Sequence, residues 1–286
     1  MERLCDIFFE FSNEDRMKIM QKLRGESMNV THLAQELGIT TQECSRHVAR
    51  LSEARLTVKE PEGTYSLTQY GSLFLKLILS QQFIADERDY FLSHSLERTP
   101  LEFVCRIGEL RGSKSTKNVM VTNHIVESII RDAEEYIWIL HDQYFLNILP
   151  PTREALSRGV KFRTFERLTK RTDGGLDPHR PSYIEEEDEI FFMKAWQRGQ
   201  VSTEFSDEID IYLYISERQA FIAFPSERGG FDYLGFYSSE PSMLGFCRDL
   251  FEYYWGSGEP LTQERGDRVY ELRKRYYRER EQARKK

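Results

Sequence analysis

The sequence predicts two domains: an α+β domain at the N-terminus, followed by an α/β domain built on a mixed sheet. The chain has 286 residues, which suits two domains at the usual size of roughly 100–200 residues each. Residues 12–68 show three helical segments and then a hairpin pattern, whereas residues 117–260 alternate strand-like and helical segments. Hydrophobic residues make up 40% of the sequence, which is enough to fill two cores.

Residues that commonly start and end helices mark out the first three. Ser12 is the expected cap of a helix that stops at Gly25, with acidic residues in its first turn and basic residues in its last. A short helix, "VTHLAQEL", ends at Gly38, and Thr40 or Thr41 then caps a third helix. The apolar residues of the third helix recur at i, i+4 and i+7 and predict one buried stripe: Cys44, Val48 and Leu51.

The third helix leads into two short β segments. Residues 56–60 and 64–68 are rich in strand-forming residues, and "PEG" between them is a turn signal, so we expect a hairpin. Arg55 stands where the helix ends. If it adopts a left-handed conformation there, the cost is on the order of 1 kcal/mol.

A long helix is expected over residues 69–96. Its apolar positions form an unusually wide band: Tyr70, Leu73, Phe74, Leu77, Ile78, Leu79, Ile84 and Phe91. A band this wide on a helix beside a small domain needs a partner surface. We therefore interpret residues 69–116 as a helical linker and dimerisation segment; the alternative is that the helix packs on the chain's own first helix.

The second part begins with a βαβ pattern. A helical stretch over residues 117–134 precedes the apolar run "YIWIL", the helix-like "REALSRG" and the strand-like "VKFRTF". The acidic run at residues 185–189 belongs to an expected polar loop. Three further β segments and an amphipathic helix complete the expected α/β domain: residues 210–216, 219–225, 231–238 and 241–255.

The N-terminal residues resemble the archaeal and bacterial ArsR-like winged-helix regulators. The resemblance lies in "LAQELGI", "SRH", Leu51, Leu56 and "YSLTQYG", and it spans about residues 12–71. It implies an α+β winged helix-turn-helix at residues 1–68 that binds double-stranded DNA. Many relatives have glycine at the position of Arg55, so the end of the third helix departs from their pattern.

A second resemblance covers roughly residues 119–258. "IDIYLYISERQAFIAFP" and "FDYLGFYSSEPSMLGFCRDLFEYYW" are similar to the middle domain of archaeal regulators that include the methanogenesis regulatory proteins. That domain is itself distantly similar to phospholipase-D-like sheet domains. The resemblance implies that residues 117–260 form an α/β sensor domain for a small molecule or protein effector.

The phospholipase-D catalytic motif is absent from the sequence. That chemistry needs His-x-Lys, in which the histidine is the nucleophile and the lysine holds phosphate. No lysine stands two residues after any of the six histidines: His32, His47, His94, His124, His141 and His179. The four cysteines are scattered without metal-ligand spacing. We expect no enzyme activity, no catalytic residue, no cofactor and no metal.

Polar side chains near the start of the third helix are the candidate DNA contacts, because that end of a recognition helix enters the major groove. The candidates, with one from the hairpin, are Thr41, Gln42, Ser45, Arg46, His47, Arg50 and Lys59. Gln42 suits adenine, and Arg46 or Arg50 suits guanine, whereas Lys59 suits phosphate. Alternatively, the two arginines are the solvated face of an ordinary helix, and His47 is structural.

Candidates for effector binding follow the expected parallel strands, since ligands of open α/β sheets bind at the carboxyl ends of strands. They are His141 and Asp142 after the first strand, Glu166 and Arg167 after the second, and Trp196 and Arg198 at the edge. Alternatively, His141 and Asp142 only cap the turn after their strand.

The negative charge lies in the middle of the chain. The formal net charge is −7, yet residues 1–80 hold 10 basic and 11 acidic side chains, and residues 264–286 hold 10 basic and 5 acidic ones. DNA affinity depends on where positive charge lies rather than on the total. The basic segment at residues 261–286 suits a solvated charged helix, a phosphate-binding arm or a partner-binding helix.

These features predict a homodimeric, sequence-specific DNA-binding transcription regulator in the cytoplasm. The longest apolar run, Leu73 to Leu79, is far shorter than the roughly 18–20 residues of a membrane span, and the first residues are too charged for a secretory signal. The alternative is a protein-interaction adaptor whose winged helix does not read DNA.

Overall fold

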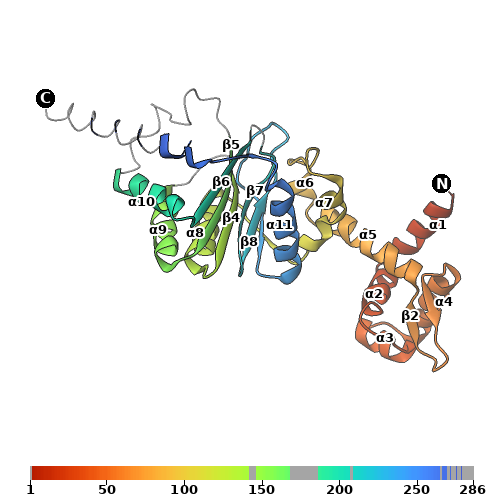
Figure 1. Ribbon diagram of the computed structural model, residues 1–286. Helices are drawn as coiled ribbons and strands as arrows, with labels where there is room; N and C mark the ends of the chain where they lie inside the picture. Colours follow the sequence, from red (N-terminus) through yellow and green to blue (C-terminus); the bar gives the residue numbers. More distant parts are fainter. Residues whose placement is uncertain are drawn as a thin grey trace. The chain divides into compact units, whose positions relative to one another are not determined.

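The chain forms two compact units in a computed structural model, Met1–Ala85 and Asp86–Lys286 (Figure 1). The structure describes residues 2–141, 146–167, 186–206, 209–264 and 266–268, together with 271, 275 and 278. Most of the predicted basic segment at 261–286 therefore lies outside the described residues.

The N-terminal unit has the predicted order of helices and hairpin, preceded by a helix that was not predicted. Its elements are α1 (Glu2–Phe11), α2 (Glu14–Lys22), α3 (Val30–Leu37), α4 (Thr41–Glu53), β1 (Thr57–Lys59), β2 (Tyr65–Leu67) and α5 (Gln69–Asp86). Strands β1 and β2 pair antiparallel, with Thr57 opposite Leu67. The hairpin is confirmed.

The helix caps mostly follow the prediction. Gly38 ends α3 with a φ of 68°, and Thr40 caps α4. The prediction that Ser12 caps α2 is wrong. Asn13 is the cap, and its side chain accepts a hydrogen bond from the Arg16 amide at 3.0 Å. Ser12 instead donates its hydroxyl to the carbonyl of Phe9, at the end of α1.

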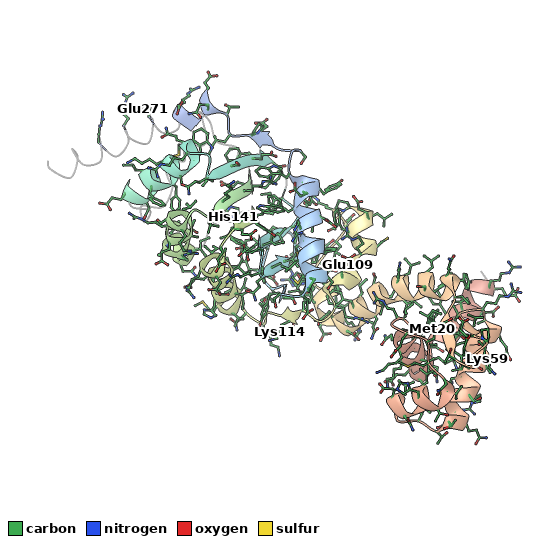
Figure 2. The ribbon with its side chains drawn as sticks, turned by 60° about the horizontal axis from the view of Figure 1, so that its bottom comes forward. Met20, Lys59, Glu109, Lys114, His141 and Glu271 are labelled. Carbon is green, nitrogen blue, oxygen red and sulfur yellow. The ribbon has the colours of Figure 1, made fainter. Side chains whose placement is uncertain are left out.

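The predicted stripe on α4 lies in the core of the N-terminal unit. Cys44, Val48 and Leu51 are fully buried there, among residues from α2, α3 and α5 that include Met20 (Figure 2). Arg55, just beyond α4, has a φ of 60°, so the expected left-handed conformation is confirmed. It allows the Leu56 amide to donate to the carbonyl of Leu51 at 2.9 Å.

Helix α5 is shorter than predicted and has two different faces. It ends at Asp86, and α6 (Arg88–Phe91) follows as a separate helix, so the prediction of one helix through residue 96 is wrong. Tyr90 anchors α6 within the second unit, because its hydroxyl donates to the carbonyl of Leu234 and accepts from the Phe224 amide.

The side chains of α5 divide into two sets. The buried set is Leu75, Ile78, Leu79 and Phe83, and the exposed set is Tyr70, Leu73, Leu77 and Ile84.

The second unit contains an eight-stranded sheet among its described residues. After α6 its elements are α7 (Leu101–Cys105), the 3-10 helix η1 (Ile107–Leu110), β3 (Lys114–Ser115), α8 (Val119–Asp132), β4 (Tyr136–His141), the 3-10 helix η2 (Leu146–Ile148), α9 (Leu149–Arg158), β5 (Lys161–Arg167), α10 (Glu186–Gln197), β6 (Val201–Ser206), β7 (Tyr212–Ser216), β8 (Ala220–Ala223), β9 (Phe236–Ser238), α11 (Pro241–Tyr254) and β10 (Glu259–Pro260). The strand order is β10-β6-β5-β4-β7-β8-β9-β3.

The sheet is mixed, as predicted. Strands β4, β5 and β6 are parallel neighbours, and the remaining pairs are antiparallel. The βαβ unit of β4, α9 and β5 is confirmed. Helices α8, α9 and α10 cover one face and α11 covers the other (Figure 1). On the α11 face, the Arg163 guanidinium contacts two indoles, with its Cζ 5.0 Å from the Trp138 ring centroid and 5.4 Å from the Trp255 ring centroid.

Two segments differ from the sequence prediction. Glu186–Glu189 begin α10, so the interpretation of residues 185–189 as a loop is wrong for these four. Residues 86–110, expected in a linker, pack on the sheet unit. Phe103 contacts Phe246 of α11 edge-to-face, and Arg106 pairs with Asp249 at 2.7 Å. None of the helices in the described ranges is long and apolar enough to cross a membrane.

Candidate nucleic-acid interface

The first turns of α4 present a polar face on a firmly capped helix. Thr41, Gln42, Ser45 and Arg46 are all exposed. At the helix start, the Thr40 hydroxyl accepts from the Glu43 amide at 3.2 Å, and the Glu43 carboxylate accepts from the Thr40 amide at 3.1 Å. Hydrogen bonds from the Thr40 side chain and backbone lower the pKa of Glu43. The face opposite the buried stripe is therefore accessible and its helix end is fixed.

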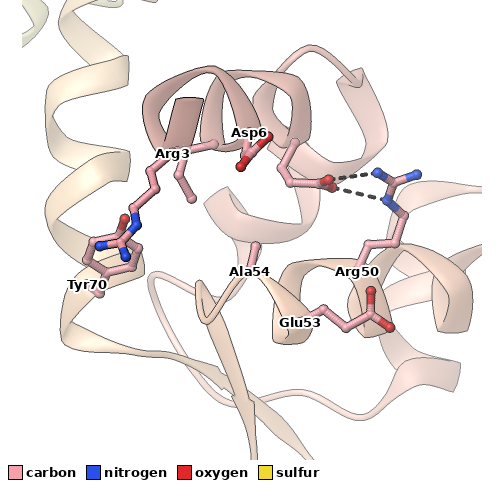
Figure 3. Close-up of a pocket in the computed structure, with 8 residues that line it drawn as sticks. Arg3, Asp6, Arg50, Glu53, Ala54 and Tyr70 are labelled. Carbon is pink, nitrogen blue, oxygen red and sulfur yellow. Dashed lines mark hydrogen bonds and ion pairs between the residues drawn. The ribbon is translucent and has the colours of Figure 1, made fainter. Parts of the chain in front are cut away.

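Arg50 does not point freely from this face. Its Nε and Nη2 donate to the Glu10 carboxylate of α1 at 3.2 and 2.7 Å, the pair joined by dashed lines in Figure 3. These hydrogen bonds raise the pKa of Arg50. Of the two arginines predicted to read guanine, Arg46 is exposed and Arg50 is engaged within the protein.

His47 lies on the buried side of α4. The residue is 7% exposed, and its Nε2 is 3.8 Å from the Asp15 carboxylate of α2. Its Nδ1 is buried without a hydrogen-bond partner. Burial lowers the pKa of His47, which favours the neutral ring. This geometry matches the structural alternative and offers no path from His47 to a base.

The hairpin carries charges of both signs. Lys59, the last residue of β1, is exposed at the surface of the N-terminal unit (Figure 2). Glu60 accepts a hydrogen bond from the Ser66 hydroxyl across the hairpin, and Glu62 is exposed in the turn. Lys59 and Glu62 are therefore both accessible on the hairpin, and their charges are opposite.

A cavity of about 500 Å³ lies beside the Arg50–Glu10 pair in the N-terminal unit (Figure 3). Its lining comes from α1, the end of α4 and the start of α5: Arg3, Asp6, Ile7, Glu10, Arg50, Glu53, Ala54 and Tyr70. No sequence motif singled out the α1 residues of this cavity. The sequence feature that indicates α1 is the helical spacing of the apolar residues Leu4, Ile7 and Phe11, with charged residues between them.

The effector candidates in the second unit do not form one cluster. His141 and Glu166 are paired neighbours at the carboxyl ends of β4 and β5, and His141 is 1% exposed beside the Tyr214 hydroxyl. Trp196 and Arg198 lie at the end of α10, which leads into the amino end of β6, so they belong to the opposite edge of the sheet. Asp142 and the side chain of Arg167 lie outside the described residues.

A family model described as a helix-turn-helix domain matches residues 11–60. These residues include α2, α3, α4 and β1. The match and the observed geometry agree that the N-terminal unit is a helix-turn-helix domain. No curated protein matches the chain.

Three solved structures are similar to the chain at low sequence identity. TrmBL2, described as an archaeal chromatin protein with a novel mode of DNA binding, is 14% identical over 86% of this chain and 93% of its own, with a TM-score of 0.40. Nuc from Salmonella typhimurium, a phospholipase D family member, is 10% identical over 48% of this chain and 89% of its own, with a TM-score of 0.33. The dimethyltransferase RosA from Streptomyces davawensis is 11% identical over 70% of this chain and 63% of its own, with a TM-score of 0.25. With TM-scores below 0.5, these likenesses do not define the function.

Proposed function

We propose that the chain is a transcription regulator that binds specific double-stranded DNA through its N-terminal unit. The observation that carries the proposal is the exposed polar face of α4, held on a capped helix within a matched helix-turn-helix domain. In this role α4 is the recognition helix and the β1–β2 hairpin is the wing of a winged helix-turn-helix.

Within this interface each exposed residue has a role suited to its chemistry. Gln42 can bond an adenine edge bidentately, and Arg46 can bond guanine. Thr41, Ser45 and Lys59 suit phosphate oxygens, which fix the register of the helix on the duplex.

We also propose that the regulator is a homodimer. Tyr70, Leu73, Leu77 and Ile84 leave an exposed apolar face along α5, and Leu4 and Phe8 do the same on α1. Phe11 of α1 packs on Phe74 of α5 with centroids 6.2 Å apart, so the two helices adjoin. A two-fold dimer would bind half-sites about one helical turn apart.

The proposed division of labour follows the sequence prediction. Residues 1–68 read DNA, residues 117–260 sense a small molecule or partner, and residues 261–286 are a basic segment. Of the predicted linker at 69–116, α5 supplies dimerisation, whereas residues 86–110 pack on the second unit. His141 and Glu166, at the carboxyl edge of β4 and β5, are the part of the predicted effector site that the fold supports.

One set of observations favours the alternative adaptor function. Arg50 is held by Glu10, His47 is buried and Glu62 occupies the hairpin turn. These features reduce the positive charge that α4 and the wing offer to a polyanion. An adaptor would use the same face of α4 to dock a protein.

Selection of binding sites from a random duplex pool tests the proposal against this alternative. A regulator would enrich a defined site, and Arg46→Ala would lose about 1–3 kcal/mol of binding to it and relax the preference at one base pair. Arg228→Ala, at an exposed position of the second unit, is the matched control and should bind as the wild type does. If no site is enriched, the DNA-reading function is wrong and the adaptor function stands.

A further inference from the structure

One carboxylate joins three helices of the N-terminal unit. Glu10 of α1 accepts two hydrogen bonds from Arg50 of α4, and it pairs with Nε of Arg16 of α2 at 3.1 Å. The side chains of Glu10 and Arg16 are 11% and 7% exposed. The charge of Glu10 is therefore balanced inside the protein by two guanidinium groups.

Helix α1 also contacts Arg16 through its backbone and contacts both guanidinium groups through the ring of Phe9. Arg16 donates to the carbonyl oxygens of Glu10 and Phe9, each at 2.7 Å. The Phe9 centroid is 5.9 Å from Cζ of Arg16 and 5.2 Å from Cζ of Arg50. A guanidinium that is bonded bidentately and stacked on a ring has a fixed position.

Arg50 lies at the margin of the exposed face of α4, between Arg46 and the buried His47. It lies one turn after Arg46, farther from the helix end that enters the groove. It also neighbours His47, which is buried against α2 and lies within 4 Å of Asp15. Arg50 and His47 thus form the side of α4 that faces α1 and α2.

We propose that Arg50 is a positioning residue rather than a DNA contact, and that Glu10 aims the recognition helix through it. This role rests on the proposed DNA binding. Transfer of Arg50 to a phosphate would leave the largely buried Glu10 carboxylate with one cation in place of two, and it would break both hydrogen bonds that Arg50 donates. The pair therefore stays closed on DNA, and α1 becomes part of the DNA-reading device.

The test measures two properties of DNA binding by each variant: the affinity, and the salt dependence of the affinity, which reports the number of phosphate contacts. Binding of the full chain to its selected duplex is measured at several salt concentrations for Arg50→Gln, Glu10→Gln and the double variant. Lys59→Ala serves as the phosphate-contact comparator and should reduce the slope of log K against log salt by about 1.

A positioning role predicts that both single variants weaken binding roughly 3–10-fold with the wild-type slope retained. The double variant should bind no more weakly than the weaker single one, because both changes break the same pair. Arg50→Lys sharpens the test. It keeps the charge but loses the bidentate bond, so it should weaken binding as much as Arg50→Gln does.

Three results would overturn the inference: a slope reduced by about 1 in Arg50→Gln, near wild-type affinity in Arg50→Lys, or tighter binding by Glu10→Gln. The last would mean that Glu10 competes with DNA for Arg50. Should Glu10→Gln fail to fold, the two Arg50 variants decide, since that side chain is 41% exposed. If the wild type selects no duplex, the proposed function fails first and the positioning role falls with it.

Discussion

Thr40 and Glu43 cap α4 reciprocally, because each side chain accepts a hydrogen bond from the backbone amide of the other residue. Thr40 also donates its hydroxyl to the Glu43 carboxylate at 2.7 Å. This capping box fixes the helix end from which Gln42 and Arg46 project.

Thr40→Ala should therefore destabilise the N-terminal unit by about 1 kcal/mol. Hydrogen exchange of the α4 amides reports this local loss. The pKa of Glu43 is lowered in the folded state. The stability that its carboxylate contributes is therefore fully present above the ordinary pKa of 4.5 and is lost as the pH falls below that value. The difference between wild type and variant should shrink in that range. Thr41→Ala leaves the cap intact, and an equal effect there would contradict the assignment.

Arg55→Gly should stabilise the same unit by about 1 kcal/mol. Arg55 has a φ of 60°, a conformation that is strained for a residue with a Cβ and unstrained for glycine. Urea unfolding followed by hydrogen exchange measures the gain. Arg55→Ala keeps the Cβ and should show none; a gain in the alanine variant would point to the arginine side chain rather than to the backbone.

Gly71→Ala should destabilise the fold by about 1–3 kcal/mol or more. A Cβ at this position would overlap the backbone carbonyl of Leu56, which cannot move without shifting the end of α4. Gly245→Ala is the control, because its Cβ would meet no atom within 4 Å and alanine favours a helix. Thermal unfolding should separate the two variants in opposite directions.

Leu77→Lys should convert the proposed dimer into a monomer. Leu77 is 48% exposed in the single chain and lies in the middle of the apolar face of α5. A charge buried in a symmetric interface is repeated on both subunits and destabilises association. Sedimentation velocity measures the outcome, with Lys76→Ala as a neighbouring exposed control. A monomeric wild type at micromolar concentration would refute the homodimer.

Glu62→Lys should tighten DNA binding and steepen its salt dependence by about 1 in slope. The change replaces an exposed carboxylate in the hairpin turn by a cation. Glu227→Lys changes the net charge equally at an exposed site of the second unit and controls for charge alone. Equal affinities in wild type and Glu62→Lys would mean that the hairpin turn does not approach the backbone.

The elements that sequence patterns predicted are those with local signals. Gly38 and Thr40 mark the boundary between α3 and α4 within a few residues, and the antiparallel β7–β8 pair follows two apolar runs joined by a short turn. The break between α5 and α6 could not be predicted in this way. It depends on Tyr90 bonding residues more than 130 positions away.

In the candidate site, too, some features follow from local sequence patterns and others depend on distant contacts. Exposure of Gln42 and Arg46 follows from the periodicity of α4, since they lie opposite the buried stripe. The engagement of Arg50 depends on Glu10, forty residues earlier on a helix without a recognisable start signal. Periodicity places a side chain on a face, whereas only tertiary packing decides what meets it there.

The pair of indoles around Arg163 gives the molecule a built-in spectroscopic reporter. The three tryptophans of the chain, Trp138, Trp196 and Trp255, all belong to the second unit, and two of them stack on a cation that also bonds Glu252. Emission excited at the indole band therefore originates entirely outside the helix-turn-helix. A change in that light on addition of a duplex therefore reports an effect of DNA on the second unit, without any introduced label.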